Sequence, residues 1–169
     1  MLDQILTLVY DSSFATMMRD SLWGYPIAEI LHHFGVVILF STILLVDLRL
    51  VGVGVHLPAR ALSGGFLLRL TWGGFALILL SGLSLFVAYA PDNFESPIIR
   101  AKMLLIALAG LNMLFFHFRV YNSIALWDRN ITPPTAARIS AALSILLWTC
   151  TIFAGRLIAY PEIFEKAGG

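Results

Sequence analysis

Charged residues are scarce in this 169-residue sequence: they make up 12% of it, whereas hydrophobic residues make up 59%. The mean hydropathy of +0.87 is far above that of a water-soluble domain of similar length. The sequence has no Lys/Arg-rich stretch, and a formal net charge of +1 gives no field that would attract nucleic acid. These absences exclude a soluble domain and a nucleic-acid-binding protein, and they predict a protein surrounded by the lipid bilayer.

Cysteine is also scarce. Cys150 is the single cysteine, so no disulfide can form within the chain. It stands in the last apolar run, where we expect a small packed side chain rather than a reactive thiol. The sequence contains no CxxCH motif, which covalent attachment of a c-type haem requires. Any haem on this chain must therefore be held without a covalent thioether bond.

Four long apolar runs dominate the sequence. A transmembrane helix needs about 20 mostly apolar residues. The runs lie at about 26–50, 66–90, 97–121 and 135–160. Because the connections between them are short, neighbouring helices should be antiparallel. We expect an all-α, polytopic membrane protein with four transmembrane helices in an antiparallel bundle, forming a single domain over residues 1–169.

The segment before the first run is too polar to cross a bilayer. Its apolar residues, such as Ile5, Leu8 and Phe14, recur at helical intervals on either side of a helix-cap signal around Ser12. We therefore expect one or two short helices within residues 1–24 that lie on the membrane surface. Arginines lie close to the span ends on the side opposite the termini, which places the termini in the periplasm by the positive-inside rule.

Histidines at membrane depth are the main candidate functional residues. His32 and His33 lie in the first run and His117 lies in the third. An imidazole among acyl chains needs a partner that hydrocarbon cannot supply, and haem iron takes histidine as an axial ligand. We interpret the three histidines as candidate iron ligands. The alternative is a hydrogen-bonded structural or proton-handling role, with Glu29 as the natural partner.

The depths of the histidines predict two haem sites rather than one. At about 1.5 Å per residue, His117 lies roughly 20 Å from His32 and His33 along the bilayer normal. At the first site, three cations suited to propionates and one possible sixth ligand are expected nearby: Arg100, Lys102, Arg156 and Met103. At the second site, His56 is a candidate partner for His117, and the favoured alternative is that His56 is a polar loop residue. Gly35 and Gly110 are expected to leave room for a flat macrocycle, with helix packing as the alternative explanation.

Several motifs carry a resemblance to known families. Residues 28–35 (AEILHHFG), 44–52 (LLVDLRLVG), 116–117 (FH) and 154–160 (AGRLIAY) resemble an uncharacterised family of small four-helix bacterial inner-membrane proteins. This resemblance covers most of the chain. The first span alone is loosely similar to copper-resistance D-type proteins and to the J-type protoporphyrinogen oxidase, in which a histidine on an early helix is associated with haem. The second resemblance implies b-type haem at His32 or His33. It implies no reaction, because the residues for porphyrinogen oxidation have no counterparts here.

These patterns predict a bacterial inner-membrane protein that holds one or two b-type haems and transfers electrons to or from quinone or a redox partner protein. Small-residue faces on the second and fourth runs favour a homo-oligomer. One alternative is an accessory subunit of a membrane complex with packed histidines. The other is a small transporter in which Glu29, His33, Asp47 and Lys102 line a proton route. Asp47 is otherwise expected to form an ion pair with Arg49 or Arg69.

Overall fold

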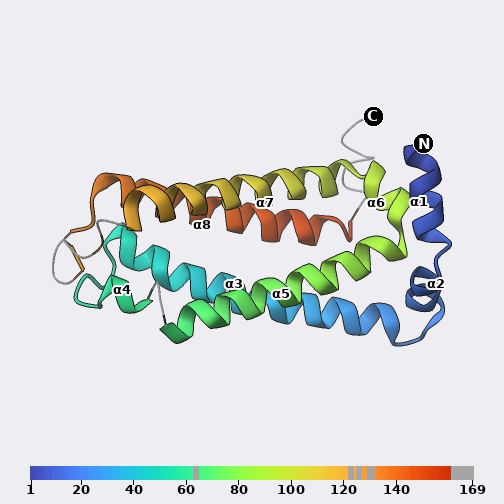
Figure 1. Ribbon diagram of the computed structural model, residues 1–169, viewed down its shortest axis with the longest axis horizontal. Helices are drawn as coiled ribbons and strands as arrows, with labels where there is room; N and C mark the ends of the chain where they lie inside the picture. The colour runs from blue at the N-terminus through green and yellow to red at the C-terminus, as the bar shows by residue number, and fades with distance from the viewer. Residues whose placement is uncertain (63–64, 122–123, 125–126, 129–131, 161–169) are drawn as a thin grey trace. The chain divides into compact units, whose positions relative to one another are not determined.

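The structure is a computed structural model that describes residues 1–62, 65–121, 124, 127–128 and 132–160 (Figure 1). Within these ranges all regular secondary structure is helical. Four helices are long and apolar enough to cross a membrane: Gly24–Val51, Gly65–Ala88, Pro97–Val120 and Thr135–Leu157. The predicted all-α class is therefore confirmed, and four helices of the expected length and hydropathy lie at the four apolar runs, with boundaries that differ by a few residues at some ends.

The helices follow one another in chain order as α1 (Leu2–Tyr10), α2 (Ser13–Asp20), α3 (Gly24–Val51), α4 (Ala59–Leu62), α5 (Gly65–Ala88), α6 (Ala90–Glu95), α7 (Pro97–Phe115), the π-helix η1 (Phe116–Val120) and α8 (Thr135–Leu157). They fall into two compact units. The first unit comprises Met1–Ser41 and Arg69–Ser96, and the second comprises Thr42–Leu68 and Pro97–Gly169. The single domain stays a prediction.

Two short helices open the first unit, as the sequence predicts. The Ser12 hydroxyl caps α2 by accepting a hydrogen bond from the backbone N–H of Ala15 at 3.2 Å. The guanidinium of Arg19 then donates to the carbonyls of Tyr10, at 2.9 Å, and Ala88, at 2.8 Å. These bonds tie α2 to the end of α1 and to the end of α5. The membrane-surface position of α1 and α2 stays a prediction.

Glycines bring α3 and α5 close together in the first unit. A Cβ atom added to Gly35 would lie 2.7 Å from Ile78 Cγ1, and one added to Gly74 would lie 2.9 Å from the backbone nitrogen of Leu39. Helix backbones approach this closely only where side chains are missing. The pair is antiparallel, since His32 precedes Gly35 on α3 but contacts Ser81, which follows Gly74 on α5.

The short connection after α5 is itself helical. Ala90–Glu95 forms the short helix α6 with Pro91 in its first turn, where proline is tolerated. The Asn93 side-chain amide donates to the carbonyls of Leu85, at 3.3 Å, and Phe86, at 3.0 Å. These carbonyls belong to the last turn of α5, so Asn93 satisfies acceptors that have no partner within the helix.

In the second unit, α7 and α8 pack side by side and are antiparallel (Figure 1). Asn112 of α7 bonds Ser140 near the start of α8, whereas Lys102, earlier in α7, packs against Gly155 near the end of α8. The span that begins with α7 ends in the π-helix η1 rather than in a regular α-helical turn.

A buried arginine organises one end of the second unit. Arg49 is 1% exposed, and it donates from Nε to the Leu57 carbonyl at 2.7 Å and from Nη2 to the Asp128 carbonyl at 2.9 Å. Gly52, with φ of +113°, lets the chain leave α3 in the left-handed region that favours glycine. A hydrophobic cluster lies at this end: Leu50, Ala59, Val120, Ile124, Trp127, Ala137 and Ala141.

Candidate functional site

His32 points toward α5 within the first unit. Its Nδ1 lies 3.2 Å from the hydroxyl oxygen of Ser81. That hydroxyl donates its single hydrogen to the Leu77 carbonyl at 2.6 Å, so it accepts from His32 Nδ1–H. The imidazole packs over Gly82, where an added Cβ would lie 3.1 Å from Cε1. His32 therefore has a packed, hydrogen-bonded position between two helices, which is the structural alternative stated above.

His33 faces outward from the same helix. Its Nδ1 lies 2.7 Å from the backbone carbonyl oxygen of Glu29, one turn earlier. A carbonyl can only accept, so Nδ1 carries the proton and a neutral imidazole keeps its lone pair on Nε2. The flanking residues on the same stripe, Ile30 and Val37, are 53% and 63% exposed. His33 thus presents an acceptor nitrogen on an otherwise apolar, exposed helix face.

Glu29, the partner that the alternative interpretation names, bonds His33 through its backbone carbonyl. This arrangement holds the imidazole by its own helix and leaves the ring's other nitrogen directed away from it. Hydrogen bonding of one ring nitrogen to a carbonyl is how proteins orient a metal-binding histidine.

His117 lies in the π-helix η1. Its ring stacks on Tyr121, with centroids 5.4 Å apart and an interplanar angle of 15°, and meets the edge of Phe118 at 5.7 Å. The described ring contacts of His117 are with these two residues, and none of them joins it to His56. Gly110 and His117 stand seven positions apart and would share a face in a regular α-helix, but hydrogen bonds in a π-helix span five residues, so that spacing does not hold beyond Phe115.

The remaining expected residues are spread over the two units. Gly35 belongs to the first unit, and its missing side chain is accounted for by the contact with α5 rather than by a ligand. Arg100, Lys102, Met103 and Arg156 belong to the second unit, so their grouping with His33 stays a prediction. Within that unit they occupy different environments: Lys102 packs on Gly155, whereas Arg156 Nη2 donates to the Tyr160 hydroxyl at 2.7 Å.

Three further expected residues also belong to the second unit: Gly110, Met103 and His56. An added Cβ on Gly110 would meet nothing within 4 Å, and Met103 is 52% exposed. His56 is an exposed residue after the left-handed Gly54. No group of three His, Cys, Asp or Glu side chains that could hold a metal ion occurs among the described residues. The candidate ligands are therefore single imidazoles, and haem is a metal group that one or two imidazoles can hold.

Asp47 is a buried carboxylate on the part of α3 that belongs to the second unit. It is 6% exposed, and its Oδ2 has no hydrogen-bond partner among the residues that the structure describes. The expected ion pair with Arg49 is not found in the described ranges, because Arg49 donates to backbone carbonyls instead. The two residues stand two positions apart on a helix, and side chains at that spacing point to different faces.

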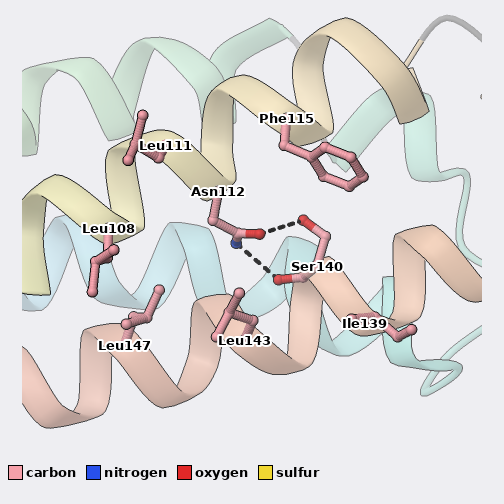
Figure 2. A pocket seen from close by; sticks show the side chains of 8 residues that line it. All are labelled: Leu108, Leu111, Asn112, Phe115, Ile139, Ser140, Leu143 and Leu147. Atoms are coloured by element: carbon pink, nitrogen blue, oxygen red, sulfur yellow. Dashed lines mark hydrogen bonds between the residues drawn. The ribbon is translucent and has the colours of Figure 1, made fainter.

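A groove of about 380 Å³ opens between α7 and α8 (Figure 2). Its lining residues are Leu108, Leu111, Asn112, Phe115, Ile139, Ser140, Leu143 and Leu147. Figure 2 shows the polar pair at its centre, where Asn112 Nδ2 donates to the Ser140 carbonyl at 2.9 Å and Ser140 Oγ donates to Asn112 Oδ1 at 3.0 Å. The sequence patterns did not predict this groove. The signal available in the sequence was Asn112, a polar carboxamide side chain within an apolar run.

No family model, curated protein or solved structure matches this chain.

Proposed function

We propose that this chain is a haem-binding integral membrane protein in which the outward-facing imidazole of His33 is an axial ligand to b-type haem. The observation that carries the proposal is the hydrogen bond from Nδ1 to the Glu29 carbonyl, which leaves the Nε2 lone pair on an exposed helix face. A lone pair at that depth has no donor in hydrocarbon, and iron is a partner that satisfies it.

The surroundings of His33 suit a flat, apolar macrocycle. Ile30 and Val37 lie one turn before and after it on the same stripe of α3, and both are exposed. A porphyrin bound at Nε2 would cover these side chains. His32 is the poorer candidate, because its ring is packed over Gly82 and its Nδ1 is bonded to Ser81. In this proposal His32 positions α3 against α5, and His33 binds the iron.

A bound haem supplies one-electron redox chemistry, and the protein sets its potential through ligand identity and burial. The residues of this chain contribute an oriented imidazole, through Glu29, and an apolar surface that keeps water away. We assign the redox partner to the quinone or protein class. A second haem at His117 is part of the same proposal, since that imidazole is also exposed and lies in a π-helix, a feature frequent at functional sites.

The finer placement of the protein is also proposed. We place it in the bacterial inner membrane as an antiparallel four-helix bundle and a homo-oligomer, with both termini in the periplasm. The apolar spans support the membrane location, and the distribution of arginine near the span ends supports the orientation.

A pyridine haemochrome assay on protein purified in mild detergent tests this function. The cells should be supplied with iron and a haem precursor. We expect b-type haem in the wild-type protein and its loss from one site in His33→Ala. His32→Ala is the matched control, because it changes the adjacent imidazole, and it should keep its haem. His33→Gly should regain haem when free imidazole is added, since imidazole can replace the missing ligand.

The outcome separates the proposal from its alternatives. A colourless protein from cells rich in haem would contradict it and favour the accessory subunit or the proton-linked transporter. Full haem occupancy in His33→Ala would show that the ligand assignment is wrong. If there are two sites, His117→Ala should lose a separate fraction of the haem, and the double variant with His33→Ala should lose all of it.

A further inference from the structure

One hydrogen-bond donor in the groove between α7 and α8 has no acceptor among the described residues. The Ser140 backbone carbonyl can only accept, so the side-chain atom of Asn112 that faces it must be Nδ2. This fixes the orientation of the amide, and the Ser140 hydroxyl then donates to Oδ1. A carboxamide nitrogen carries two hydrogens. The second N–H of Asn112 has no acceptor in the part of the chain that the structure describes.

The span Pro97–Val120 is long and apolar enough to cross a membrane, and we place this donor within the hydrocarbon layer. Asn112 stands eight residues before the end of that span, which is at most about 12 Å because the last five residues form the π-helix η1. The ester carbonyls of phospholipids lie at the edge of the hydrocarbon layer, so they do not reach this level. An acceptor for Asn112 at this level belongs to another protein chain or to a lipid-soluble molecule that carries an oxygen acceptor such as a carbonyl.

The residues that line the groove restrict the class of ligand further. Apart from the Asn112 and Ser140 pair, every residue that lines it is apolar. Phe115 lies at one end and is half exposed, so its ring offers a face on which a planar ring can stack (Figure 2). A small-molecule site commonly combines such apolar walls with a few polar groups that fix orientation, in volumes upward of about 300 Å³.

We propose that the groove between α7 and α8 binds a lipid-soluble quinone. A ring carbonyl oxygen accepts from the second N–H of Asn112, the ring packs near Phe115, and the tail follows the leucine side chains toward Leu108 and Leu147. This inference names the redox partner of the proposed haem function and rests on that function only for its role in electron transfer. Binding itself needs no haem, so the two proposals fail separately.

Photoaffinity labelling of the detergent-purified, haem-free protein tests the site. The probe is an azido-benzoquinone with a decyl tail, and mass spectrometry locates the label. We expect labelling to concentrate on residues 108–115 and 139–147. Unlabelled decyl-benzoquinone should compete. Decylbenzene has the ring and tail but no carbonyl, so it should compete about three- to tenfold more weakly. This factor corresponds to the net free energy that one hydrogen bond contributes to binding.

Two pairs of variants locate the contacts. Asn112→Leu should lower labelling by about the same three- to tenfold factor. Its matched control is Met113→Leu, which changes the adjacent residue of α7 outside the groove lining and should leave labelling unchanged. Leu108→Phe should block the groove and lower labelling, whereas Leu104→Phe should not, because Leu104 lies on the same helix but does not line the groove.

The proposal is overturned if decylbenzene competes as well as the quinone, because the groove would then hold an alkyl chain without recognising a carbonyl. Label spread evenly over all helices would also overturn it. The competition experiment uses the wild-type protein alone, so it decides the matter even if Asn112→Leu fails to fold.

Discussion

The helix pair of the first unit and the helix pair of the second unit are held together by different kinds of contact. In the first unit, Gly35 and Gly74 let the backbones of α3 and α5 meet directly. In the second unit, α7 and α8 meet through side chains: Asn112 bonds Ser140, and Gly155 receives the flexible side chain of Lys102. Direct backbone contact leaves no space, whereas contact through side chains leaves a groove with a polar centre.

Each unit also contains an arginine that donates to two backbone carbonyls. Arg19 in the first unit is partly exposed and lies over the Tyr10 ring at 3.8 Å. Arg49 in the second unit is buried, and its Nη1 has no hydrogen-bond partner within the described ranges. The same kind of arginine contact therefore occurs once at a partly exposed position and once at a buried position. Burial should determine how much each arginine contributes to the free energy of unfolding.

The largest effect is expected from Arg49→Met. This substitution removes the donors to the Leu57 and Asp128 carbonyls and leaves unfilled volume at a buried position. We expect the free energy of unfolding to fall by about 2–4 kcal/mol. Arg19→Met should cost about 1 kcal/mol, because water can replace its bonds. Denaturation of the detergent-solubilised protein by sodium dodecyl sulfate, followed by circular dichroism, measures both. Equal losses would mean that burial does not distinguish the two arginines.

An intermediate effect is expected from Gly74→Ala. The added Cβ would lie 2.9 Å from a backbone nitrogen that cannot move aside, and overpacking of this kind costs about 1–3 kcal/mol. Gly155→Ala should be tolerated, because its Cβ would meet Lys102 Nζ at 3.3 Å, and that flexible side chain can shift. The same denaturation measurement compares them.

Gly73→Ala is the control for this comparison. Gly73 is adjacent to Gly74, and an added Cβ would meet nothing within 4 Å. Alanine should therefore stabilise the helix by about 0.5–1 kcal/mol. If Gly73→Ala and Gly74→Ala have the same effect, the close approach of α3 and α5 is not what requires glycine at position 74.

The spans were predictable because lipid imposes one strong rule on a sequence. A crossing helix must be long and apolar, and this rule places all four spans without any tertiary information. The helix α6 was not predictable in the same way. Its six residues have no apolar period, and its position depends on Asn93 reaching back to Leu85 and Phe86.

The candidate site was less predictable than the spans. His32 and His33 are adjacent, and apolar residues surround both, so hydropathy does not say which one faces outward. Their environments differ because His32 contacts Ser81 and Gly82, about fifty residues later in the chain, whereas His33 bonds a carbonyl of its own helix. The π-helix at His117 likewise has no sequence pattern of its own. Sequence reasoning therefore named candidate ligands but not their orientation, and at Gly35 it left open a ligand and helix packing, of which the structure shows a close contact with α5.

The smallest effect is expected from Ser140→Ala, which tests the side-chain contact that distinguishes the second unit. The variant loses the bond from Ser140 Oγ to Asn112 Oδ1 but keeps the bond from Asn112 to the Ser140 backbone. Interhelical bonds in membranes contribute about 0.6 kcal/mol on average, so a loss of that size is expected. Ser84→Ala removes a hydroxyl bonded only within its own helix and should cost less. Equal losses would mean that the α7 and α8 pair is held by its leucines, and that Asn112 serves the groove rather than the packing.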